Sequence, residues 1–403
     1  MPVIDRSDSK LFTPLTIGNG ALQLSHRVVH APLTRCRGIP VGSSEPCRDW
    51  MADELLAEYY TQRATPGGLI ITEALAVSVE AGATPGIPGI YLPEQAAGWK
   101  KVVDAVHAQG AYIYAQIWHG GRTSVSQLIG KPAVSASAVP ITDEVCPGTG
   151  CKFEDDPPRE MTVEDIKNTV AQFVVCAKNA IEAGFDGIEL HGANGYLLDQ
   201  FLNDNINKRT DDYGGSPEKR CRFVLELVDA VVAAIGQEKV AIRLTPFGLF
   251  NQTRGSQRLE TWGHLCREIK RKYQLSYVHF IEPRYEQIIA PEEKEGFLTS
   301  WGLKDITLDS FREIMGDTPF FSAGGWNHTN SWGLIESGKY DALVYGRYFL
   351  ANPDFIDRLR KGLPFNKYDR NRFYGPFPER EPGYIDYPRF ENLDRWNGQV
   401  VSY

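Results

Sequence analysis

Eight short apolar segments, separated by longer amphipathic ones, constrain the fold of this 403-residue chain more than any other feature. Their residues are apolar without the alternation of a one-faced sheet, as expected for parallel strands that are buried on both faces. The segments span residues 28–32, 68–72, 111–116, 187–190, 239–244, 276–281, 319–322 and 342–345. We therefore expect eight parallel strands.

Helix-period stretches lie between most of these segments, at 96–108, 163–183, 217–235, 259–273 and 308–315. Thr162 precedes an acidic first turn, and Gly184 and Gly236 follow two of the stretches, as helix boundaries require. This alternation predicts an α/β fold, a single (β/α)8 TIM barrel. The alternative is an open doubly wound sheet, which normally carries G-x-G-x-x-G after its first strand. That glycine pattern is missing after residue 32, so the barrel is favoured.

We expect one domain over residues 1–403, with the barrel core at about 25–365 and a tail, 366–403, packed on it. Loop or hairpin excursions should cover the C-terminal mouth of the barrel. The Pro-, Ser- and Gly-rich stretch 123–160 is one candidate for a small hairpin, and 282–301 is a candidate lid. A long polar loop, 38–49, follows the first strand.

Composition excludes several classes of protein. Apolar residues make up 42% of the chain, which is too many for disorder, and the formal charge of −8 argues against nucleic acid or an anionic membrane as partner. The chain shows neither a long apolar run nor a secretory signal, so we expect a soluble, cytoplasmic protein. The cysteine spacing predicts no metal site, and it leaves a disulfide between Cys146 and Cys151 open.

Glycines follow the last two predicted strands. Gly324 and Gly325 come after the seventh strand, and Gly346 and Arg347 come after the eighth. In barrels of this kind these two loops commonly bind a phosphate through backbone N–H groups, and an arginine adds a charged fork. The alternative is a pair of tight turns beside a surface arginine. We favour a phosphorylated substrate or cofactor.

His191, Asn194 and Tyr196 lie within six residues at the end of the fourth strand, where barrel enzymes place their active sites. His and Asn can polarise one carbonyl oxygen, and Tyr can deliver a proton. A lone histidine is more often structural, but three such groups together favour function. Gln116, Arg243 and Thr34 also end strands, and they can hold a ring with amide edges; a simple Gln–Arg bond within the barrel is the alternative.

Longer motifs run through the same segments: RVVHAPLTRCR, QIWHGGR, GFDGIELHGANGYLLDQFLNDNINKRTDDYGGSPEKRCRF, IRLTPFGLFN, FFSAGGW and ALVYGRYFLANPD. Together they resemble the old yellow enzyme family of FMN-dependent NADPH:enone oxidoreductases, or ene-reductases. The likeness runs from about residue 11 to residue 390 and is greatest to the fungal, plant and yeast branch. The motif that starts at Gly184 is the most specific.

The resemblance implies tightly but non-covalently bound FMN at the C-terminal mouth of the barrel. Its isoalloxazine ring is expected to contact Pro32, Leu33, Thr34, Ala74, Gln116 and Arg243. Its phosphate is expected to contact Gly324, Gly325, Gly346 and Arg347. Ala74 stands where many relatives have glycine, and the loops 38–49 and 142–156 look longer than usual, so the relatives' substrate preferences transfer poorly.

The resemblance also implies a ping-pong reaction in which NADPH reduces the flavin and an α,β-unsaturated aldehyde or ketone then accepts the hydride. His191 and Asn194 would bind the carbonyl oxygen, Tyr196 would protonate the α-carbon, and Trp118, Phe250 and Tyr374 would line the pocket. The oligomeric state is expected to be a monomer or homodimer.

Different functions remain open at this point. The nearest is that of a dedicated fungal biosynthetic member, similar to the ergot-alkaloid reductases, that reduces or isomerises one unsaturated aldehyde. A non-flavin barrel enzyme acting on a sugar phosphate would require the cluster of His191, Asn194 and Tyr196 to be coincidental. An idle flavin- or steroid-binding protein would have no use for those three residues. The general ene-reductase is therefore favoured.

Overall fold

The computed structural model describes residues 5–43, 46–283, 299, 306–395 and 398–401. Its centre is a closed barrel of parallel strands, each paired with the next along the chain and the last paired with the first. The strands are β3 (Val28–His30), β6 (Leu69–Ala76), β7 (Tyr112–Trp118), β10 (Gly187–Gly192), β11 (Val240–Leu244), β12 (Tyr277–Ile281), β13 (Phe320–Ala323) and β14 (Ala342–Tyr345). All eight coincide with the predicted segments, so the TIM-barrel prediction is confirmed.

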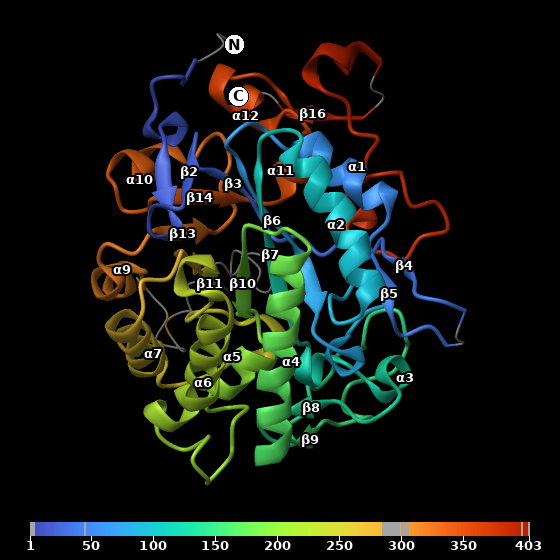
Figure 1. Ribbon diagram of the computed structural model, residues 1–403, viewed down its shortest axis with the longest axis vertical. Coiled ribbons are helices and arrows are strands. Elements are labelled where there is room, and N and C mark those ends of the chain that lie inside the picture. The colour runs from blue at the N-terminus through green and yellow to red at the C-terminus, as the bar shows by residue number, and fades with distance from the viewer. Residues whose placement is uncertain (1–4, 44–45, 284–298, 300–305, 396–397, 402–403) are drawn as a thin grey trace.

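Helices surround the strands as an outer layer (Figure 1). The helices are α1 (Glu54–Arg63), α2 (Pro93–His107), α3 (Ser126–Ile129), α4 (Val163–Glu182), α5 (Leu197–Leu202), α6 (Pro217–Ile235), α7 (Arg258–Lys272), α9 (Asp309–Met315), α10 (Trp332–Glu336), α11 (Arg347–Ala351) and α12 (Phe355–Lys361). The predicted start of α4 is confirmed, because the Thr162 hydroxyl accepts from the Asp165 amide at 3.1 Å and Asp165 accepts from the Thr162 amide at 2.7 Å. This reciprocal pair satisfies two donors at the helix start.

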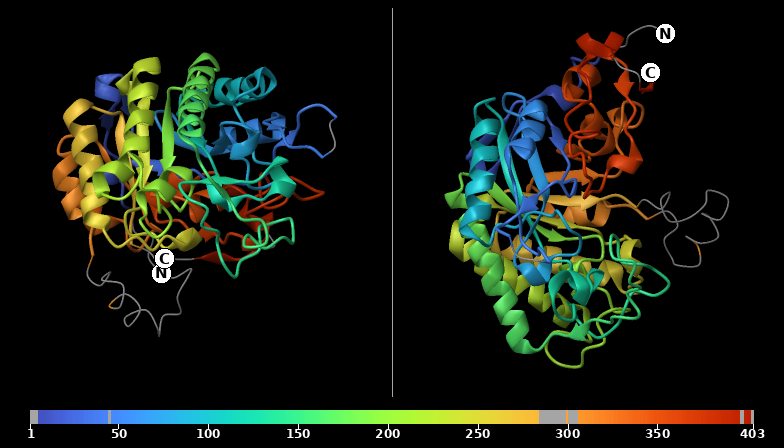
Figure 2. Two further views of the ribbon diagram at one scale, coloured as in Figure 1. Left: turned by 90° about the horizontal axis from the view of Figure 1, so that it is seen from below. Right: turned by 90° about the vertical axis from the view of Figure 1, so that its right-hand side faces the viewer.

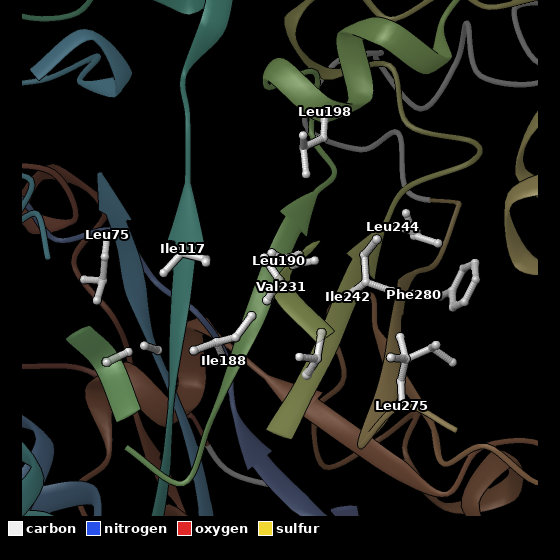
Figure 3. Close-up of a cluster of buried hydrophobic side chains, with 14 of the residues drawn as sticks. Leu75, Ile117, Ile188, Leu190, Leu198, Val231, Ile242, Leu244, Leu275 and Phe280 are labelled. Carbon is white, nitrogen blue, oxygen red and sulfur yellow. The ribbon is translucent and has the colours of Figure 1, made fainter. Parts of the chain in front are cut away.

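The core has an outer and an inner part. Side chains on the outer faces of the strands, such as Leu75, Ile117 and Ile242, pack toward the helices (Figure 3). Side chains on the inner faces fill the barrel, and a hairpin of β1 (Leu15–Ile17) and β2 (Leu22–Leu24) adds Ile17 and Leu24 to that inner cluster. This hairpin was not predicted, because three-residue strands are too short to show a period.

The excursion 123–160 contains a parallel pair of short strands, β8 (Val134–Ser135) and β9 (Arg159–Glu160), and one antiparallel bridge between Val145 and Lys152. The Cys146 amide donates to the Cys151 carbonyl at 2.8 Å, but the two thiols are not joined. The loop 38–49 contains β4 (Ile39–Pro40), which pairs antiparallel with β5 (Trp50–Met51), the strand that follows the loop. The candidate lid, 282–301, lies almost wholly outside the described residues.

The C-terminal segment, red in Figure 2, packs against the N-terminal part of the chain, and its strands β15 (Phe365–Asn366) and β16 (Val400–Val401) pair with each other. Two buried arginines make this contact. Arg35 donates to the carbonyl oxygens of Phe373 at 3.0 Å, Arg372 at 3.1 Å and Gly383 at 2.8 Å. Arg37 donates to Phe373 at 3.1 Å and Arg372 at 2.8 Å. The loop after β3 is therefore held by the tail. How the chain divides into domains stays a prediction.

Replacing Arg35 with methionine should release the tail. Methionine keeps an apolar stem, but it takes one donor from the carbonyl oxygens of Phe373 and Arg372, which keep Arg37, and it leaves that of Gly383 without its donor. A carbonyl oxygen that stays buried without a donor costs about 1–3 kcal/mol. We expect limited proteolysis within residues 372–384 to become at least tenfold faster while the barrel remains folded. The control is Arg271→Met, which removes an exposed ion pair with Glu268. Equal cleavage rates in both variants would contradict this role of Arg35.

Candidate functional site

Strand register brings five polar side chains together inside the barrel. Gln116 on β7 is the register partner of Glu189 on β10, and two residues further along β10 His191 is the partner of Arg243 on β11. Arg243 is in turn the partner of His279 on β12. Register partners on adjacent strands point to the same face, and residues two apart share it as well. All five side chains are buried.

The Glu189 carboxylate is the centre of this group. Gln116 Nε2 donates to its Oε1 at 2.7 Å, while the Tyr277 hydroxyl at 3.1 Å and His279 Nδ1 at 2.9 Å reach its Oε2. Burial alone would raise the pKa of Glu189, but His279, Arg243 and Gln116 outweigh it and hold that pKa below its ordinary value. Burial also lowers the pKa of His279. At neutral pH the site therefore holds an ionised Glu189 and a neutral His279.

Several buried nitrogen atoms in this region have no hydrogen-bond partner in the described part of the chain. They are Arg243 Nε, His191 Nδ1, Trp118 Nε1 and His279 Nε2. Unpaired buried polar groups are rare in folded proteins, and a cluster of them marks a place where a bound molecule completes the hydrogen bonds. Among the residues that the structure describes, no group of His, Cys, Asp or Glu side chains is arranged to hold a metal ion.

The turn after β10 carries Asn194 and Gly195 in the left-handed conformation, with φ of 58° and 72°. Its backbone is held from three sides. The Asn194 amide donates to Thr245 Oγ1 at 3.0 Å, Asn251 Nδ2 donates to the Asn194 carbonyl at 2.8 Å, and the Gly195 amide donates to Asp199 Oδ2 at 2.7 Å. The backbone of Asn194 is therefore held by Thr245 and Asn251 from other parts of the chain as well as by its own turn.

The same turn is connected to the excursion 123–160. Gln252, the neighbour of Asn251, donates through Nε2 to the Thr142 carbonyl at 2.7 Å and accepts from the Thr142 amide at 3.1 Å. Asn251 and Gln252 both have positive φ, 52° and 57°, in the short helix η6 (Phe250–Gln252). The excursion thus reaches Asn194 through two consecutive side chains.

Tyr196 stands at the beginning of α5, with its ring edge-to-face against Trp118 at 5.1 Å and against His191 at 5.0 Å. Burial, and next the neighbouring Tyr374 phenol, raise the pKa of Tyr196, so its hydroxyl keeps its proton. Burial and the Arg243 charge lower the pKa of His191 well below its usual value, so its ring is neutral. A protonated phenol and a neutral imidazole are thus available side by side.

The glycines and the arginine predicted to bind a phosphate come directly after the C-terminal ends of two adjacent strands. Gly324 and Gly325 follow β13, Gly346 and Arg347 follow the adjacent β14, and a Cβ added at Gly346 would lie 3.3 Å from Leu33 Cδ2. A side chain at this position would therefore require the Leu33 side chain to shift.

The residues expected around the ring and the pocket differ in exposure. Pro32 is buried after β3, Thr34 is half-buried, and Ala74 is the register partner of Gln116. Trp118 is buried, whereas Phe250 and Tyr374 are 51% and 65% exposed. These last two belong to the surface around the mouth and not to its interior.

Sequence reasoning missed Glu189, His279, Asp199 and Asn251. For the first two a signal existed. Glu189 lies two residues before His191 in an otherwise apolar strand, and His279 interrupts a strand of the same kind. Strand periodicity places such polar residues on the inner face, together with the polar residues at the strand ends. Asp199 and Asn251 act through the backbone of a turn, which leaves no trace in the spacing of side chains.

Asp199 should make the stability of the fold depend on pH. Burial raises its pKa from 3.8 to about 7, so between those values the folded state holds a proton that the unfolded state has lost. The free energy of unfolding therefore falls as the pH rises. In Asp199→Asn, whose amide oxygen still accepts from Gly195, the fall between pH 5 and pH 7.5 should be smaller by about 2–3 kcal/mol in urea titrations. The exposed Asp317→Asn should leave that fall unchanged; an equal effect of both variants would refute the assignment.

Comparison with known families gives one match over most of the chain. Residues 10–366 match the family described as NADH:flavin oxidoreductase / NADH oxidase. The chain is 46% identical to the flavin oxidoreductase hxnT of Emericella nidulans, over 94% of this chain and 97% of that protein. It is 41% identical to 12-oxophytodienoate reductase 1 of Oryza sativa subsp. japonica, over 95% of this chain and 94% of that protein.

The fold is also similar to a solved structure. The old yellow enzyme homologue of Zymomonas mobilis superposes with a TM-score of 0.83 at 31% sequence identity. The superposition covers 94% of this chain and 99% of that one. The likeness therefore spans nearly the whole length of both chains.

Proposed function

The chain belongs to the NADH:flavin oxidoreductase / NADH oxidase family, the old yellow enzyme family, and we propose that within it the chain is an FMN-dependent ene-reductase. Its substrates would be α,β-unsaturated aldehydes or ketones, and its reductant NADPH. The observation that carries the proposal is the meeting of His191, Asn194 and Tyr196 beside Gln116 and Arg243. Membership of a flavin oxidoreductase family excludes the non-flavin enzyme acting on a sugar phosphate.

The residues at the mouth fit FMN. The unpaired nitrogen of Arg243 and the amide of Gln116 offer donors and an acceptor to a ring with amide edges. Pro32, Leu33, Thr34 and Ala74 would contact the same ring, and Gly324, Gly325, Gly346 and Arg347 would hold the phosphate. When bound, FMN supplies hydride transfer, from the nicotinamide to the flavin and from the flavin to the β-carbon of the substrate.

His191 and Asn194 would bind the carbonyl oxygen of the substrate. Neutral His191 has one N–H to donate, and the Asn194 amide is a second donor whose backbone is held by Thr245 and Asn251. Negative charge develops on this oxygen as hydride reaches the β-carbon. Donors that are already in place stabilise such a charge by a few kcal/mol in comparable sites.

Tyr196 would be the acid of the reaction. Its phenol is protonated at neutral pH and its ring is held between Trp118 and His191, so the hydroxyl has a fixed direction. Protonation of the α-carbon by this hydroxyl completes a net reduction. The presence of this tyrosine favours reduction over isomerisation, and so favours the general ene-reductase over a dedicated isomerising relative.

Tyr196→Phe tests the acid. The ring contacts remain but the proton is lost, so we expect enone reduction to slow by about 10²-fold or more, the usual contribution of a general acid. Stopped-flow bleaching of the flavin by NADPH should stay within about twofold of the wild type, since that half-reaction needs no proton from Tyr196. Equal loss in both half-reactions would show that Tyr196 has a structural role.

The double variant His191→Ala, Asn194→Ala tests the oxygen site. Phenols bind such sites as anions and give a long-wavelength charge-transfer band with an oxidised flavin. We expect the band to vanish at phenol concentrations that saturate the wild type, because both donors to the phenolate oxygen are gone. Single variants should weaken phenol binding by at least tenfold each. A band of unchanged affinity in the double variant would remove both residues from the oxygen site.

A further inference from the structure

The Glu189 carboxylate makes a set of contacts inside the barrel that the reaction described above does not use. We propose that Glu189 is a positioning residue for the flavin: it fixes which end of the Gln116 amide faces the mouth, and it balances the charge of Arg243. In this role it sets the affinity and the reduction potential of the bound flavin. The inference rests on the proposed function, because it concerns the site in which FMN would lie.

The orientation of Gln116 follows from hydrogen-bond chemistry. An ionised carboxylate only accepts hydrogen bonds, and the contact at 2.7 Å between Glu189 and the Gln116 amide must therefore use Nε2 as donor. The carbonyl Oε1 of Gln116 is left as the acceptor for a bound molecule. The guanidinium of Arg243 can only donate. Glu189 thereby determines that the pair offers one acceptor beside a set of donors, which suits a ring N–H next to ring carbonyls.

Glu189 also supplies negative charge close to Arg243. Glu189 is fully buried, and it is the one anion among the five side chains, because Gln, His and Arg carry no negative charge. The nearby Tyr277 phenol also keeps its proton. Charges interact strongly in such a dry interior. Removal of the negative charge would leave the positive charge of Arg243 uncompensated beside the flavin. Reduction puts more negative charge on a flavin, and so that removal should favour the reduced form.

A purely structural explanation of Glu189 is less consistent with its contacts. A buried carboxylate is costly and is seldom retained for stability alone, since a well-packed apolar residue usually serves as well. Here both oxygens of the carboxylate contact a partner on another strand, Gln116 on the adjacent β7 and His279 on β12, which lies two strands away on the other side. β7 and β12 lie on either side of β10 and β11, the two strands that carry His191 and Arg243.

The test is the midpoint potential of the flavin in Glu189→Gln, measured at pH 7 by equilibration with a reference dye. The substitution keeps the shape and removes the charge. We expect the ratio of reduced to oxidised flavin to rise at least tenfold at a given potential, which is a shift of about 30 mV toward positive values for two electrons. The matched control is Tyr277→Phe, which removes a hydrogen bond from the same carboxylate and leaves the charge; its ratio should change less than twofold. Equal potentials in wild type and Glu189→Gln would overturn the charge assignment.

Glu189→Asp separates positioning from charge and serves if Glu189→Gln does not fold. The charge remains, but the carboxylate is withdrawn by one methylene and loses its contact with Gln116. We expect the dissociation constant of FMN, measured by quenching of flavin fluorescence on binding to the apoprotein, to rise at least tenfold. The potential should shift less than in Glu189→Gln. An unchanged dissociation constant in a folded Glu189→Asp protein would refute the positioning role.

Measurements of FMN binding and reduction by the wild-type protein separate a failure of the proposed function from a failure of the proposed role of Glu189. If it binds no FMN, the proposed function itself fails. If it binds FMN and is reduced by NADPH, but the Glu189 variants keep the wild-type affinity and potential, only the role of Glu189 is refuted.

Discussion

Closure of the sheet is the constraint on which the rest of this structure depends. Eight parallel strands can pair without an edge only if each holds a fixed register with both of its neighbours. That register determines that His191, Arg243 and His279 stand at one level, and that Gln116 and Glu189 stand at the next. Groups that are more than seventy residues apart in sequence thereby reach hydrogen-bond distance without any loop to guide them.

Burial sets the protonation states on which the chemistry would rely. The barrel interior keeps the Tyr196 phenol protonated and the His191 ring neutral, whereas Glu189 remains ionised because donors and the Arg243 charge outweigh its burial. Two neutral groups and one anion thus lie close together at one pH. An acid, an uncharged donor and a fixed anion can coexist there only because each has its own set of neighbours.

The strands and most of the site were predictable from the sequence, since an apolar run with a polar residue at its end is a local pattern. The prediction of α6 at 217–235 was correct at both ends, because a serine cap, a proline and a final glycine mark it. Glu189 and His279 were missed because they lie within their strands and not at the strand ends. The hairpin of β1 and β2 was missed because it is stabilised by contact with the inside of the barrel and not by its own period. Asp199 and Asn251 bind backbone atoms, and such contacts exist only in three dimensions.

The link from the excursion through Gln252 and Asn251 to Asn194 has a consequence for how such an enzyme diversifies. The excursion reaches this link through a bidentate contact at Thr142, while Ser135, Ala136 and Ser137 fasten it to the residues that follow β10. Changes in the exposed part of the excursion can alter substrate preference while the groups proposed to perform the reaction stay unchanged. The variable segment and the candidate reaction site are thus connected through only two consecutive side chains on this path, those of Asn251 and Gln252.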